Sequence, residues 1–477
     1  MSIWSHLPSP FVASRILGIG AALFAVVGTG CSSMANYSKQ SSSYYNAFRM
    51  GQLTDASNQV STLAAEEAGS GSAILHNLER GSVLRAAGHT ADSTSAFSLA
   101  EAAIEDYDRR AQVSARDVGS EVAAVASNDR VLPYTGYAYD RIMLNTYKAL
   151  NFLRFGNHEA ARVELRRAYE RQRDSVRKYQ EEIEATAGAA QAKGMDYTSI
   201  RQDARYAPRW PEGAPNLRQY SAYTDFVNPF TTWLDGVVFM YTSDDLSDRD
   251  RARSSLNRVV GMIGEHPALM ADLAVLPGLP TEPVVYVVVE NGVAPTRREN
   301  RFDLPVPVSG KIYYAGVALP ELQFSNTDFG SMSISGGGRE LGRTDRLCSM
   351  DAIVAREFEQ RYAMWVTRAL LGAAFRLGSQ IAVGEVVRKE QGDDAALLAT
   401  AAMSLLSFAV TRADLRTWQT LPKEWQFARV QRPADGRLRI SGGPLQLNVE
   451  LPDAQATLVY IRTAPPGLLR VETITLR

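Results

Sequence analysis

The chain has 477 residues, of which 45% are hydrophobic, and its 51 basic and 52 acidic side chains leave a formal net charge of −1. This composition excludes an intrinsically disordered chain, and the charge balance gives no basic surface of the kind that nucleic-acid binding needs. We therefore expect no nucleic-acid partner, and the length allows two or three domains.

The first thirty residues have the order that is typical of a secretory signal peptide. Arg15 precedes an apolar run at residues 16–27, and small residues then lead into Cys31. The run is shorter than the ~20 residues that span a bilayer. Because the signal ends at a cysteine, it resembles a bacterial lipoprotein signal, in which this cysteine is acylated. Ordinary secretion is the alternative, because Gly28 stands where lipoprotein signals usually place Leu.

Residues 31–43 are polar and predict a flexible tether behind the anchor. Ser32 stands where a signal for retention in the inner membrane usually has Asp. The resemblance to Gram-negative lipoproteins therefore implies the outer membrane, with the protein held by acyl chains and facing the periplasm. The other cysteine, Cys348, is expected to be buried and inert, because it is left without a disulfide partner and no histidine follows His266.

Residues 44–277 are predicted to form helical hairpins of the tetratricopeptide type. The clearest match surrounds Gly156, where small and bulky residues alternate as two closely packed antiparallel helices require. Gly88 gives a second match, in which Gly81 and Phe97 take contact positions, and Gly51 gives a poorer third. A further helical pair is predicted at residues 228–263, with Asp248 as an N-cap. A helical bundle without repeat geometry is the alternative.

Two inferences follow from the predicted hairpins. Such repeats bind peptides or proteins with the exposed residues of their first helices. Arg141, Asn145 and Lys148 are therefore candidate partner-binding residues. Residues 159–189 lack proline and carry an apolar stripe, so they predict a long helix packed on its own domain.

The pattern changes near residue 278, where β-branched runs begin to alternate with turns. An amphipathic helix is predicted at residues 351–388, and a second, apolar helix at residues 395–411. The second is about 25 Å long, short of a ~30 Å hydrocarbon core. We expect it to be a buried core helix, with membrane insertion as the alternative. Five further strands are predicted in residues 425–475, which gives an α+β arrangement.

Catalytic and metal-binding motifs are missing from the sequence. Gly336-Gly337-Gly338 lacks the Lys-Ser/Thr of a phosphate loop and predicts a hairpin turn. The histidines show no metal-ligand spacing. We therefore expect a protein that is not an enzyme and that uses no metal and no small-molecule cofactor.

Two segments look specific without being catalytic. One spans residues 290–305 and carries three arginines after a turn. In the other, residues 413–425, Asp414, Arg416 and Trp418 are predicted to form a salt-bridged corner covered by an aromatic ring. Such a corner would fix a helix against a sheet.

Four features together resemble a family of bacterial envelope lipoproteins with tetratricopeptide-like helices and a distinctive C-terminal domain, for which no activity is established. They are the signal, residues 136–172, VENGVAPTRRE and ADLRTWQTLP. The predicted organisation is α+β and multidomain: a signal at 1–30, a tether at 31–43, all-α hairpins at 44–277, and at 278–477 a mainly antiparallel β domain with a long helical pair. The predicted function is that of a lipid-anchored periplasmic scaffold that binds an envelope protein or peptide. The alternative is an envelope glycan-binding or glycan-processing protein with a cleft in the C-terminal domain.

Overall fold

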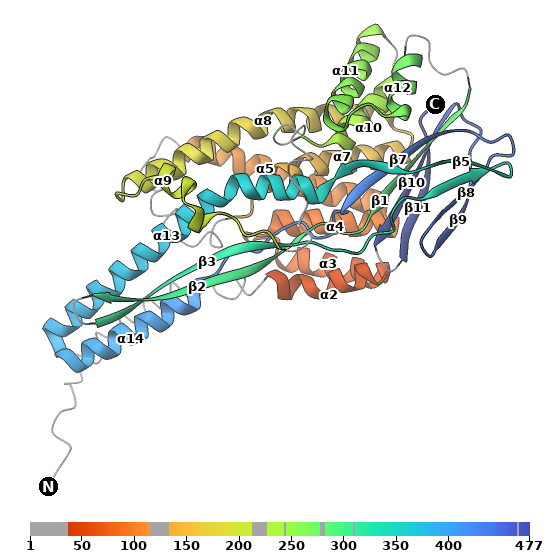
Figure 1. The fold of residues 1–477 in the computed structure, drawn as a ribbon. Helices are drawn as coiled ribbons and strands as arrows, with labels where there is room; N and C mark the ends of the chain where they lie inside the picture. Colours follow the sequence, from red (N-terminus) through yellow and green to blue (C-terminus); the bar gives the residue numbers. More distant parts are fainter. Residues whose placement is uncertain are drawn as a thin grey trace.

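The computed structural model describes residues 37–114, 133–211, 227–242, 245–276, 282–308, 311–464 and 467–477. Helices come first in the chain, and strands begin after residue 283 (Figure 1). The helices of the first part are α2 (Tyr37–Arg49), α3 (Leu53–Glu66), α4 (Ala73–Ala87), α5 (Thr90–Ser114), α7 (Ala138–Arg154), α8 (His158–Gln191), α9 (Tyr197–Gln202), α10 (Pro229–Tyr241), α11 (Leu246–Ile263) and α12 (Pro267–Val275), with a short 3₁₀ helix, η2 (Ala204–Tyr206).

The predicted helical pairs are present. Gly51, Gly88 and Gly156 each separate two helices and have φ between 69° and 86°, a backbone conformation that glycine adopts without strain. A Cβ atom built on Gly81 of α4 would lie 2.4 Å from the ring of Phe97 in α5, so these helices approach closely because Gly81 has no side chain. Whether the pairs follow repeat geometry stays a prediction.

Three details of the helical part can be compared with the expectations. The long helix predicted at residues 159–189 is α8, and it packs on α7, α10 and α13 (Met350–Gln391) of its own chain. Asp248 is not the N-cap of α11; Asp245 accepts the capping hydrogen bond, from the backbone of Asp248. The tether predicted at residues 31–43 is wrong for residues 37–43, because these belong to α2, which begins at the buried Tyr37; residues 31–36 lie outside the described residues.

The described residues of the C-terminal part form three sheets. A five-stranded sheet has the order β11-β10-β1-β7-β6, in which β1 and β10 are parallel and the other neighbours are antiparallel. A four-stranded sheet has the order β5-β4-β8-β9, and β2 and β3 form a separate ribbon. The strands are β1 (Val284–Asn291), β2 (Thr296–Val308), β3 (Lys311–Gln323), β4 (Ser333–Gly336), β5 (Arg339–Arg343), β6 (Asp345–Ser349), β7 (Glu424–Gln431), β8 (Arg437–Gly442), β9 (Leu445–Glu450), β10 (Ala456–Ala464) and β11 (Gly467–Thr475).

The α+β class and its order of elements are therefore as predicted. All five expected C-terminal strands are present, as β7 to β11. The helical pair between the strands consists of α13 and α14 (Asp393–Val410). The three glycines at 336–338 make the turn between β4 and β5, with φ of 57° at Gly337 and 77° at Gly338.

Strand β1 is buried along its whole length because both faces of its sheet are covered. Tyr286 and Val288 belong to the large hydrophobic core shared with the helices, and Val285 and Val287 belong to a second core shared with the four-stranded sheet. Helices thus cover one face of the five-stranded sheet, and the small sheet covers the other.

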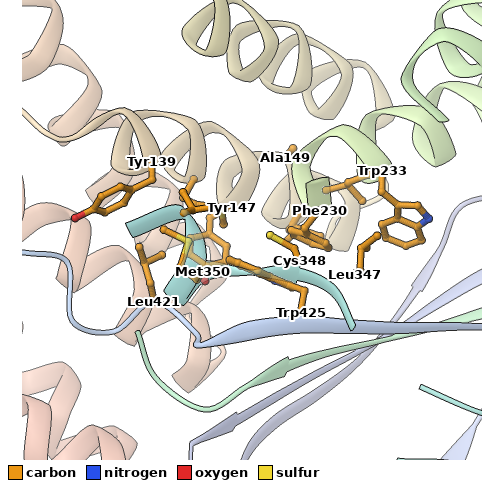
Figure 2. Close-up of a cluster of buried hydrophobic side chains, with 14 of the residues drawn as sticks. Tyr139, Tyr147, Ala149, Phe230, Trp233, Leu347, Cys348, Met350, Leu421 and Trp425 are labelled. Carbon is orange, nitrogen blue, oxygen red and sulfur yellow. The ribbon is translucent and has the colours of Figure 1, made fainter. Parts of the chain in front are cut away.

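The large core joins the two halves of the chain. In Figure 2, aromatic residues of α10 lie against residues of β6 and β7. Phe230 stacks on Trp425 with ring centroids 4.9 Å apart, and Trp233 meets Phe427 edge-on. The predicted boundary at 277/278 therefore separates the helical from the strand-rich part of the sequence, while the hydrophobic core continues across it.

One group of elements extends away from this body. The C-terminal half of α13, α14 and the β2–β3 ribbon run side by side and form an arm, at the lower left of Figure 1. We call residues 371–410 together with the β2–β3 ribbon the arm throughout.

Candidate functional site

The predicted lipidation site, Cys31, lies outside the described residues. The first described residue, Tyr37, is fixed firmly to the body. Its hydroxyl donates hydrogen bonds to Glu79 of α4, at 3.0 Å, and to the carbonyl of Thr417, at 3.2 Å. Five residues at most therefore separate Cys31 from a rigid part of the protein.

The expectation that Arg141, Asn145 and Lys148 are exposed on the first helix of a hairpin is wrong. Their exposed fractions are 8%, 0% and 4%. They face carboxylates of the neighbouring helices because α7 is surrounded by α5, α8 and α10. These residues hold helices together, and we do not propose them as partner contacts.

Each of the three has a carboxylate partner. The Lys148 ammonium lies 2.6 Å from Glu101 and 2.9 Å from Glu164, and the Asn145 amide donates to the same two side chains. Arg141 pairs with Asp108 at 2.8 Å. Burial alone would raise the pKa of Glu101, but the hydrogen bond and charge of Lys148 outweigh it and hold the pKa below its usual value.

The predicted corner at residues 413–425 joins the helices to the sheet. Arg416 and Asp414 form the expected ion pair, at 2.8 Å. The ring that covers Arg416 belongs to Tyr134, whose centroid lies 5.7 Å from the guanidinium carbon. Trp418 is fully buried, and its indole N–H donates to Ser82 of α4 at 2.9 Å. The corner is thus a structural junction.

Glu79 completes this junction, although no sequence motif singles it out. It accepts hydrogen bonds from Tyr37, from the backbone amides of Gln419 and Thr420, and from the Thr420 hydroxyl. Burial raises its pKa to about 7, although these hydrogen bonds act in the opposite direction. The side chain binds α2, α4 and the corner to one another.

A polar pocket between α4, α7 and the five-stranded sheet bears on the glycan alternative. Two carboxylates, Glu290 and Glu472, line it. Glu290 lies 3.0 Å from Arg462 and accepts a hydrogen bond from Tyr460, while Glu472 lies 3.4 Å from Arg85. Carboxylates paired in this way with buried arginines stabilise a junction, and they do not offer the unpaired acid and base that glycoside hydrolysis needs.

The arm contradicts a further expectation, because α14 is not a buried core helix. Leu397, Leu398 and Leu405 have exposed fractions of 66%, 72% and 71%, and that of Phe408 is 46%. The prediction that the uncharged run is a helix is confirmed, but within the described residues no part of the body covers its outer face. A long run of uncharged residues is expected both for a helix buried in a core and for a helix in contact with a membrane. The sequence of this run therefore could not distinguish the two.

The interior of the arm contains polar groups. Gln380 of α13 is fully buried and bonds both backbone groups of Tyr314 in β3, at 3.3 and 3.0 Å. Its amide oxygen also accepts a hydrogen bond from Ser404 of α14. Arg376 donates to the carbonyl of Gly316 at 3.0 Å. The arm therefore encloses polar groups beside apolar ones such as Leu371 and Ala396, and it places leucines of α14 on the outside, where an ordinary soluble unit has polar residues.

A shallow surface pocket lies where the arm joins the body. Arg368, Arg376 and Arg412 line it together with Trp365 and Asp414. Arg412 also pairs with Glu299 of β2 at 3.2 Å. Three arginines and one carboxylate thus lie in a mostly apolar lining at the base of the arm.

Cys348, the other cysteine, is buried as expected. It belongs to β6, and burial raises the pKa of its thiol to about 12, so it is not a nucleophile at neutral pH. Within the described ranges, no group of three or more His, Cys, Asp or Glu side chains is placed to hold a metal ion.

Among the described helices, α13 is long and apolar enough to cross a membrane, judged by length and composition alone. Of the apolar 18-residue segment that meets this criterion, 28% is buried. The chain matches no protein-family model, no curated protein and no solved structure.

Proposed function

We propose that this protein is a lipid-anchored scaffold of the bacterial envelope, held by acyl chains on Cys31 at the inner leaflet of the outer membrane and facing the periplasm. The observation that carries the proposal is the short connection between Cys31 and the body. Tyr37 is already buried and bonded to Glu79 and Thr417. The six Cα–Cα steps from Cys31 to Tyr37 span about 20 Å at most. A protein attached in this way stands close to its membrane.

The body suits a scaffold because its interior charges are used for structure. Lys148, Glu79 and the Arg85–Glu472 pair each connect elements that are distant in the sequence. This interlocking favours a rigid support with a fixed orientation over a flexible carrier. An envelope protein or peptide remains the proposed partner, bound through the outer surface of the body, since Arg141, Asn145 and Lys148 are buried.

Metabolic labelling with an alkyne analogue of palmitate tests the anchor. In a Gram-negative host, the wild-type chain should be labelled and should sediment with the outer membrane. Cys31→Ala should abolish the label, whereas Cys348→Ala, which removes the other cysteine of the chain, should leave it unchanged. Equal labelling of the wild type and Cys31→Ala, or no label on either, would contradict the proposal.

A further inference from the structure

The outer face of α14 is apolar over a broad arc. Its exposed positions are Leu397, Leu398, Ala401, Ala402, Leu405 and Phe408. At 100° per residue they cover about 140° of the helix circumference. A second helix packed as a coiled coil would need a narrower a/d stripe. The apolar face of α14 is therefore wider than one partner helix would cover, and acyl chains could cover all of it.

The outer face of α13 continues this surface. Ala374, Phe375, Gly378, Ala382 and Val386 are exposed, and Phe375 and Val386 have exposed fractions of 62% and 55%. These positions lie opposite Arg376 and Gln380, which bond to β3. The exposed face of α13 between residues 374 and 382 is therefore free of charge, as is that of α14 between 397 and 408. Glu385, whose side chain is 41% exposed, follows on the same face of α13 and pairs with Arg388 at the end of the helix.

Charged side chains bound this surface at both ends. The end of α13 and the start of α14, on either side of Gly392, carry Arg388, Lys389, Glu390, Asp393 and Asp394, all exposed. Arginines line the pocket at the other end. Carrying five charges through hydrocarbon is costly. The arrangement instead fits a helical pair lying in the plane of the interface, with its apolar face in the acyl chains and its ends at the headgroups.

The free edge of the ribbon is unsuited to pairing with a strand of a second copy. Both backbone groups of Tyr314 bond to Gln380, so they point away from β2. In the antiparallel register Tyr314 faces Pro305, and Ile312 faces Pro307. Because facing residues of such a pair turn their backbone groups in opposite directions, both prolines fall on the open edge of β2. That edge lacks two N–H donors, which blocks edge-to-edge association.

The position of the anchor brings the arm near a membrane, a step that rests on the proposed function. Tyr37 bonds to Thr417, seven residues beyond the end of α14. Acyl chains on Cys31 would therefore enter the bilayer on the side of the body from which the arm extends.

We propose that the arm is a second, non-covalent membrane contact, in which the outer faces of α13 and α14 lie among the acyl chains of a bilayer. The arginines of the pocket at the base of the arm then meet anionic headgroups. Together the two contacts fix the orientation of the body on the membrane, which a single anchor cannot do.

Flotation with vesicles tests this contact independently of lipidation. The chain from Ser32 to Arg477, which retains every described residue but lacks Cys31, is mixed with vesicles of equal parts phosphatidylcholine and phosphatidylglycerol. It should float with them. Leu398→Lys/Leu405→Lys should lower the bound fraction about tenfold or more. The control Leu246→Lys/Met270→Lys changes two exposed apolar residues of the body and should bind as the wild type does.

The outcomes separate the alternatives. Circular dichroism shows whether the variants remain folded, which is expected because the replaced side chains are exposed. A wild-type chain that does not float, or a Leu398→Lys/Leu405→Lys variant that floats equally well, overturns the proposal. It is also overturned if the wild type forms oligomers without floating and the arm variant is monomeric, because the arm is then an interface between copies. Failure of the palmitate label, by contrast, would affect only the anchor.

Discussion

The polar residues of α7 are an example in which the sequence predicts the helix and not the environment of its side chains. Arg141, Asn145 and Lys148 lie on one face of a helix, a pattern that normally marks the solvent side. Here that face meets Glu101 of α5 and Glu164 of α8, which lie 47 and 16 residues from Lys148 in the sequence. Only the packing of three helices brings the opposite charges together. A polar stripe on a helix predicts that its surroundings are polar. The sequence of one chain does not show whether those surroundings are water or polar side chains of other helices.

Glu79 gives a prediction at the same scale. Its pKa is about 7 in the folded protein and 4.5 in a free side chain, so the folded state binds the extra proton. Stability should therefore fall as pH rises from about 4.5 to 7. Glu79→Gln removes this contribution and should flatten the pH dependence of the free energy of unfolding by about 1–3 kcal/mol.

Urea denaturation at pH 5, 6 and 7.5 measures this effect. Glu450→Gln, a change of the same kind at an exposed position, should leave the slope of the wild type unchanged. If Glu79→Gln and Glu450→Gln show the same pH dependence of the unfolding free energy, the pKa of Glu79 is not raised by folding.

Helices and strands could be predicted well from local pattern. The glycines that end α2, α4 and α7, the buried run of β1 and the alternating C-terminal strands are local signals, and all of them hold. The environment of α14 is different. Its uncharged residues predict a helix, but whether a leucine is covered depends on elements elsewhere in the chain. The same run suits a core and a membrane surface.

Gly81→Ala tests the close contact between α4 and α5. A methyl group at this position would overlap the ring of Phe97, so the variant should lose about 1–3 kcal/mol of unfolding free energy. Gly188→Ala is the matched control. It lies within α8 with no atom within 4 Å of the added carbon, and there alanine should be neutral or stabilising by up to ~1 kcal/mol. Equal urea midpoints for the two variants would show that the contact is unimportant.

The whole molecule has one large core with an arm attached to it. The core unites α10, α7 and the five-stranded sheet, so the helical and strand-rich halves of the sequence stabilise each other. The arm has a different distribution of polarity, with Gln380 buried and Leu398 exposed. A protein in which one part is built for water and another for lipid is oriented by its own structure. The short link from Cys31 to Tyr37 is consistent with the same orientation.

The most direct measurement of this orientation is the depth of Leu398. Leu398→Cys in the Ser32–Arg477 chain is labelled with an environment-sensitive fluorophore, while the buried Cys348 is protected from the reagent. On vesicles with doxyl groups on their acyl chains, the label at position 398 should shift to the blue and be quenched. The same label on Leu246→Cys in the body should show neither change. Equal emission at both positions, with and without doxyl lipid, would contradict the account.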